Sequence, residues 1–224
     1  MRWLVLIGAA VALLAACGQS PDPKPAPSSS KAAAGTTHIN LANIERVGGE
    51  LPAGYEVGTV EGSASPAGFW GFGSGWAADP PHCAGLVDPV GATAGFAKGV
   101  SGSGAGGIVY AVVVTSPSGP VALDPAVVAD CGHWTMAHGS ATASVDLIDT
   151  PPIDGVATLG MVSATRTLVE GGSEIASQEH TFAAYLGDHY AFVTLITDPG
   201  SPYPPLQPGF AADLLVKTVS ALRG

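Results

Sequence analysis

The second half of this 224-residue chain consists mainly of strand-like segments that follow one another with short turns between them. Residues 107–115 carry a continuous β-branched and apolar run that is typical of a buried strand. Three glycine-marked segments then follow, and Gly187-Asp188 suits a two-residue type II′ hairpin. The expected strands after residue 115 cover residues 141–148, 156–169, the stretch from the Glu170-Gly171-Gly172 turn to Leu186, and 189–197.

Helical patterns lie outside this run of strands. Asn40 is a candidate N-cap for a short helix through Arg46, and Asp124-Pro125 starts a helix that ends at about Cys131 or Trp134. Residues 207–222 form the C-terminal helix, with an apolar stripe along one side. Strands in one run with helices outside it predict an α+β fold, in which an antiparallel β-sheet is flanked by helices in a single domain with one disulfide. The content of 31 glycines and 19 prolines agrees with many turns.

The N-terminus has the pattern of a lipoprotein leader. A short basic start and an apolar run lead to Leu14-Ala15-Ala16-Cys17, which fits a lipobox. We expect a signal peptide over residues 1–16 and lipid attachment at Cys17. Residues 17–37, rich in Pro, Ala and Ser, should form a flexible lipid-anchored tether, and residues 38–224 the extracellular domain. The alternatives are a plain signal peptide with a chance cysteine, or one transmembrane helix, for which the apolar run is short.

The charge balance excludes some partners. The formal net charge is −10, which repels phosphate backbones and argues against nucleic-acid binding. It also gives no attraction to anionic lipids, so contact with the membrane should come from the lipid anchor alone, at the outer face of the cell membrane.

Two cysteines remain after Cys17. Cys83 and Cys131 form an even pair, and in an exported domain such a pair favours a disulfide over two buried free thiols.

No catalytic or metal-binding pattern is recognised, and the sequence predicts no catalytic residue, no metal and no cofactor. Residues 102–107 match G-x-G-x-x-G, but they precede a strand instead of following one, so a flexible loop is expected there. His133 and His138 are five residues apart and do not share a helix face. Glu179 and His180 should point to opposite faces of a strand, which argues against a dyad.

An aromatic, glycine-rich segment covers residues 69–76. It contains the ligand-binding candidates Trp70, Phe72 and Trp76, which could form a mobile aromatic lip over a pocket. The alternative, which we favour, is that these rings pack in the core and anchor an irregular segment.

The motif Pro80-Pro81-His82-Cys83-Ala84-Gly85 resembles the mycobacterial extracellular sensor domains of the PknH type, and in particular a lipoprotein subfamily of unknown function. The resemblance covers most of residues 38–224. It implies an antiparallel sheet flanked by helices, a Cys83–Cys131 disulfide and a cleft for an unidentified ligand, with no catalytic residues to carry over. The kinase sensor has two disulfides, whereas this chain has cysteines for one.

These observations favour a non-catalytic extracytoplasmic domain that binds a small or lipidic ligand, or a partner protein of the envelope. The alternatives are an envelope hydrolase with an unrecognised site and a lipid carrier. A Ser or Asp beside a His in a cleft would indicate the hydrolase, and a continuous apolar tunnel the carrier.

Overall fold

A nine-stranded antiparallel sheet forms the centre of the protein in the computed structural model, which describes residues 38–91 and 95–224. Every pair of neighbouring strands is antiparallel, in the order β1-β3-β4-β9-β8-β7-β6-β5-β2. The described residues fall within one compact unit. The predicted boundaries at residues 16 and 37, and the lipidation site Cys17, lie outside the described residues.

The strands are β1 (Glu56–Gly62), β2 (Ala77–Asp79), β3 (Ala97–Gly104), β4 (Gly107–Thr115), β5 (His133–His138), β6 (Ala141–Ile148), β7 (Ala157–Leu168), β8 (Glu174–Leu186) and β9 (His189–Thr197). The helices are η1 (Leu41–Glu50), α1 (Pro66–Phe69), η2 (Pro81–Cys83), α2 (Ala84–Val87), α3 (Pro125–Asp130) and α4 (Pro208–Arg223), where η denotes a 3-10 helix. The antiparallel sheet is therefore as predicted, but the flanking helices in the described part of the chain are few and mostly short.

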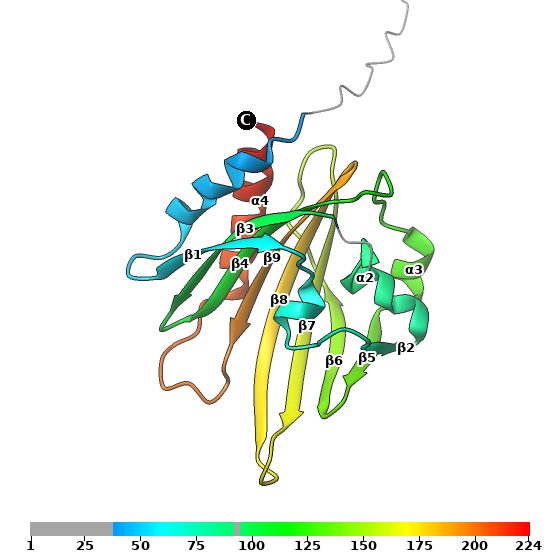
Figure 1. The fold of residues 1–224 in the computed structure, drawn as a ribbon, viewed down its shortest axis with the longest axis vertical. Coiled ribbons are helices and arrows are strands. Elements are labelled where there is room, and N and C mark those ends of the chain that lie inside the picture. The colour runs from blue at the N-terminus through cyan, green and yellow to red at the C-terminus, as the bar shows by residue number, and fades with distance from the viewer. Residues whose placement is uncertain (1–37, 92–94) are drawn as a thin grey trace, which may run out of the picture. The chain divides into compact units, whose positions relative to one another are not determined.

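One face of the sheet, the helix face, is covered by α4 and η1 (Figure 1). Leu214, Leu215, Val219 and Leu222 recur at helical spacing along α4 and are all buried. They pack against alternate residues of the central strands, so this face holds a regular apolar core.

The opposite face, the strap face, is covered by short helices and irregular chain (Figure 1). Residues 63–76, here called the strap, run across it and contain α1. The helices α2 and α3 lie further along the same face, over the strands that end the sheet at β2. The strap face therefore has a core as well, but one without a long helix.

The local signals predicted several elements well. Asn40 accepts a hydrogen bond from the backbone N–H of Ala42 at the start of η1, and Asp124 accepts one from Ala126 at the start of α3. The helix α3 ends at Asp130 with Cys131 as its C-cap, which agrees with the earlier of the two predicted ends. Trp134, the later predicted end, belongs to β5. Gly187 has φ 74° in the two-residue connection between β8 and β9, as a primed hairpin turn requires.

The expectation of a flexible loop at residues 102–107 is wrong. Gly102 and Gly104 belong to β3, and the chain turns directly into β4. A Cβ on Gly102 would lie 2.7 Å from Leu51 Cδ1, and one on Gly104 would collide with the ring of Tyr55. The glycines are therefore needed because Leu51 and Tyr55 lie directly on the strand backbone.

Candidate functional site

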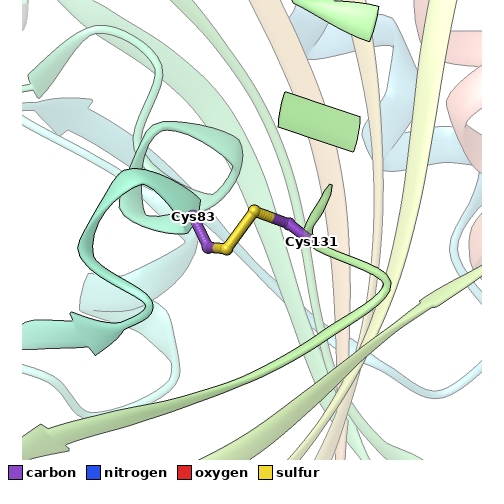
Figure 2. The surroundings of a disulfide bond; sticks show 2 residues. All are labelled: Cys83 and Cys131. Atoms are coloured by element: carbon purple, nitrogen blue, oxygen red, sulfur yellow. A yellow bond between two sulfur atoms is a disulfide. The ribbon is translucent and has the colours of Figure 1, made fainter. Parts of the chain in front are cut away.

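The predicted disulfide is present and fixes α2 to the end of α3. Cys83 lies at the junction of η2 and α2, and Cys131 follows the last turn of α3 (Figure 2). Their sulfur atoms are bonded, with the Cα atoms 5.7 Å apart, and both residues are fully buried. The side-chain ligand atoms of His82, Cys83 and Cys131 lie within 4.8 Å of one another, but the two sulfurs are committed to each other and cannot bind a metal in this form.

The strap is held to the sheet by its aromatic rings. The ring of Phe69 stacks on Tyr110 of β4 with centroids 4.0 Å apart. The indole N–H of Trp70 donates to Thr181 Oγ1 of β8 over 3.1 Å, and Thr181 in turn shares a 2.9 Å hydrogen bond with Thr194 of β9. Trp70 is therefore a buried anchor whose polar atom is satisfied by the sheet.

Phe72 and Trp76 are placed differently from Trp70. Both line a cleft between the strap and α2, here called the strap cleft, and Trp70 is not among its lining residues. The cleft measures about 470 Å³, which falls within the range of small-molecule sites. Phe72 is almost fully buried, whereas Trp76 is half-buried and presents part of its ring to the cleft. The rest of the lining is small and polar: Ser63, Ala64, Ser65, Gly73, Ser74, Gly75, Ala84, Gly85, Asp88 and Gly91.

Asp88 is the one ionisable residue among the described residues of that lining. It follows α2, and its Oδ1 accepts a 3.0 Å hydrogen bond from the backbone N–H of Gly91. Burial raises the pKa of the Asp88 carboxyl, although hydrogen bonds from the backbones of Gly91 and Val90 act in the opposite direction. The carboxylate is therefore partly removed from water at the wall of an open cleft.

The charge of Asp88 also affects Tyr190, a buried residue of β9 that does not line the cleft. The residue is buried and its hydroxyl has no hydrogen-bond partner among the described residues. Burial, followed by the proximity of Tyr185 and Asp88, raises the pKa of the Tyr190 phenol well above its usual value. Buried polar groups are normally hydrogen-bonded, so the Tyr190 hydroxyl is an exception, as is the Trp134 indole N–H in the described chain.

A second buried acid, Glu179, lies on the strap face of β8. It is completely buried, and its carboxylate accepts hydrogen bonds from Ser177 and, over 2.9 Å, from Thr165 of β7. Ser163 joins the same group through a 3.2 Å hydrogen bond with Thr165. Desolvation raises the pKa of the Glu179 carboxyl, against the lowering effect of these hydroxyls. The cluster consists of hydroxyl groups and one carboxyl, with no cation among its hydrogen-bond partners in the described chain.

Two histidines pair with aspartates in the described residues. His133 Nδ1 lies 2.8 Å from Asp146 Oδ1, and His189 Nδ1 lies 2.7 Å from Asp188 Oδ1. The first pair is more than half exposed on the strands β5 and β6, and the second lies at the β8–β9 turn. None of the four residues lines the strap cleft, so these pairs do not place a base beside it.

A further hollow of about 460 Å³ lies where the start of β4, the start of β8 and the end of β9 come together. It is lined by Ile108, Ile175, Ser177 and Asp198, among others, and both of these isoleucines are exposed. It lacks an aromatic wall, and Glu174 in its lining is already paired with Arg166 at 2.7 Å. The strap cleft is the better candidate because it combines aromatic rings with an acid that has no basic partner.

The sequence matches a family model over nearly the whole described domain. The model is that of a domain of unknown function, DUF5642, and it covers residues 40–223. The chain belongs to the DUF5642 family. No curated protein matches it. In the described part of this DUF5642 chain, no helix has both the length and the apolar character needed to cross a membrane.

Two solved structures similar to this DUF5642 domain come from mycobacteria. One is an uncharacterised protein of Mycobacterium smegmatis, the Rv0999 ortholog, with a TM-score of 0.62 and 20% identity over 84% of this chain and 98% of that chain. Another is the extracellular domain of PknH from Mycobacterium tuberculosis, with a TM-score of 0.47 and 16% identity over 83% of this chain and 92% of that chain. The resemblance predicted from the Pro-Pro-His-Cys-Ala-Gly motif is confirmed, and the first of these structures shows the fold.

The sequence missed Asp88, Tyr190 and the Glu179 cluster. Ser177, Glu179 and Thr181 alternate along β8, which places all three on one face of the strand. That alternation was a usable signal. The partners Ser163 and Thr165 on β7 become visible only once the register is known, because it sets Ser163 opposite Glu179 and Thr165 opposite Ser177.

Proposed function

We propose that this DUF5642 protein is a lipid-anchored envelope protein whose domain binds a small ligand in the strap cleft without transforming it. The observation that carries the proposal is the cleft itself. It combines the partly exposed ring of Trp76, the buried ring of Phe72, and the carboxyl group of Asp88 in a volume suited to a small molecule. The disulfide between Cys83 and Cys131 holds the α2 wall in place, and it supports an oxidising location outside the cytoplasm.

The rival functions have less support. A lipid carrier would need a continuous apolar lining, whereas the strap cleft is lined largely by serines, glycines and one carboxyl group. A hydrolase would need a nucleophile next to a base, and the His–Asp pairs of the described chain lie outside the cleft lining.

Ligand binding can be tested by native mass spectrometry of the full-length protein, purified in mild detergent from a mycobacterial expression host. We expect a bound small molecule to remain with the wild-type protein. Trp76→Ala removes an aromatic wall of the cleft and should reduce the retained fraction about tenfold, since an aromatic contact contributes about 0.5–1.5 kcal/mol beyond its buried area. Tyr203→Ala is the matched control, because Tyr203 is an exposed aromatic residue outside the strap cleft. Equal retention by both variants would place the ligand elsewhere.

Anchoring can be tested at Cys17. We expect Cys17→Ser to abolish acylation, so that the protein is released or accumulates as an uncleaved precursor. The check is metabolic labelling with a fatty acid, followed by detergent phase partitioning. A variant that remains acylated and partitions like the wild type would contradict the lipobox.

A further inference from the structure

We propose that the strap cleft selects ligands that carry an ammonium group attached to apolar carbon, with Asp88 as the charge partner and Trp76 as an aromatic wall. This inference rests on the proposed function and adds the chemical class of the ligand. It depends on three independent observations: the charge of the cleft, the charge of the domain around it, and the identity of the cleft walls.

The cleft has a negative charge that none of its own residues neutralises. Among its described lining residues Asp88 is the one acid, and these residues include no Lys, Arg or His. The backbone N–H of Gly91 satisfies part of the carboxylate, but no basic side chain pairs with it in the described chain. A bound cation would supply the missing charge partner, whereas a bound anion would be repelled.

The domain around the cleft also has a net negative charge. Residues 38–224 contain 17 acidic and five basic side chains. Three of the basic ones are already paired with glutamates in the described structure: Lys98 with Glu45 at 2.6 Å, Arg166 with Glu174 at 2.7 Å and Lys217 with Glu50 at 2.7 Å. The long-range field therefore attracts cations and disfavours anionic ligands such as phosphates and carboxylates.

The walls indicate an organic cation. Phe72 and Trp76 give the cleft apolar surface, which a hydrated metal ion could not use. An ammonium group next to an aromatic ring gains a cation–π attraction, and its alkyl substituents bury apolar area against the same ring.

The charge requirement can be isolated with two probes of the same shape. Choline carries a quaternary ammonium group, and 3,3-dimethylbutan-1-ol is its uncharged isostere, with carbon in place of nitrogen. Ligand-observed NMR titrations of the full-length protein in a non-ionic detergent would measure both affinities. We expect choline to bind at least about tenfold more tightly than the isostere, because cation–π and charge-pair contacts in partly desolvated sites reach that size.

Two variants with equal changes in net charge provide the control. Asp88→Asn should reduce the preference for choline to less than about twofold, while leaving the affinity for the isostere nearly unchanged. Asp213→Asn alters an exposed acid on α4, on the opposite face of the sheet, and should retain the wild-type preference. Circular dichroism and thermal unfolding would verify that both variants are folded.

The outcomes separate this inference from the proposed function. Equal affinity for the two probes, a preference that survives Asp88→Asn, or absence of choline binding would overturn the inference. If the mass spectrometry then still finds a neutral ligand, such as a carbohydrate, whose retention depends on Trp76, the binding function stands and only the ligand class is wrong. If no retained ligand depends on Trp76 either, both proposals fail.

Discussion

The helix face of the sheet is covered mainly by one 16-residue helix whose apolar residues follow a single stripe, and the buried residues of its core include no cysteine and no acid in the described chain. The strap face is closed by short helices and irregular chain, held by a disulfide, by ring stacking on β4 and by a hydrogen bond from Trp70. Both faces bury their side chains, but in the described part of the chain it is the strap face that holds the strap cleft and the fully buried carboxyl group of Glu179. Regular packing thus provides stability on one side, and irregular packing provides the candidate binding site on the other.

The largest effect should come from the helix face. Leu215 is fully buried in α4 against the central strands. Leu215→Ala removes its side chain and leaves a cavity, which should lower the free energy of unfolding by about 3–5 kcal/mol. Chemical denaturation followed by circular dichroism measures this loss. Val216→Ala is the control, because Val216 lies next to Leu215 on α4 and is partly exposed, and it should cost less than about 1 kcal/mol. Similar losses for both variants would contradict the idea that the stripe on α4 closes this face.

The next effect should come from the strap face. The bond between Cys83 and Cys131 joins residues separated by 48 positions, and the chain-entropy model gives about 4 kcal/mol for such a loop. We expect Cys83→Ser combined with Cys131→Ser to lower the free energy of unfolding by about 2–4 kcal/mol, and the melting temperature by about 5–15 °C. The far-ultraviolet circular dichroism spectrum should remain close to that of the wild type, because Cys83 and Cys131 lie in η2 and at the end of α3, outside α4 and the strands of the sheet.

The same double variant sharpens the comparison between the two faces. Hydrogen exchange should become faster in η2, α2 and the strap and remain slow in α4 and β9, since local opening follows the elements that lose a constraint. A uniform increase in exchange over both faces would mean that the sheet transmits the loss, and that the two faces do not differ in the way described above.

The two faces also differ in how far the sequence predicts them. The strands β4, β6, β7, β8 and β9 have apolar or β-branched runs and glycine-marked turns, and α4 has a clear stripe, so local pattern is sufficient there. The strand β3 was missed because Ala97–Gly104 contains three glycines and has low β-propensity. It is a strand because β1 and β4 pair with it on both sides, and pairing between distant segments is not visible in local sequence.

The candidate site was predicted only in part for the same reason. The aromatic segment stood out in the sequence, and the preferred expectation of core packing holds for Trp70 and Phe72, which are both buried in the core of the strap face. Phe72 and Trp76 do line a cleft, but its other wall comes from α2, and Asp88 belongs to it only because the disulfide and the fold bring α2 next to the strap. Which acids become buried depends on tertiary packing, and no residue pattern in one chain specifies that.

The smallest effect should come from Glu179, the fully buried acid on the strap face of β8. Burial raises the pKa of its carboxyl above the ordinary value of 4.5. An acid with a raised pKa keeps its proton in the folded protein at pH values where the unfolded chain has lost it. The folded state then binds more protons, so the contribution of this group to stability falls as the pH rises from about 4.5 through the pKa of the folded state.

Glu179→Gln removes this dependence while keeping the shape and the hydrogen-bonding capacity of the side chain. We therefore expect the melting temperature of the variant, relative to wild type, to increase between pH 4 and pH 7, and the unfolding free energies to show the same trend. Asp88, with a pKa also raised by burial, adds a slope of the same sign to both proteins, and His180, with a pKa lowered by burial, adds one of the opposite sign. Because both contributions are common to the two proteins, the difference between them isolates Glu179.

Glu170→Gln, the same chemical change at an exposed turn, should give a difference that does not vary with pH. A variant that is destabilised more at pH 7 than at pH 4 would show that the hydroxyls of Ser177 and Thr165 hold Glu179 ionised, and the strap face would then contain a buried charge instead of a neutral acid.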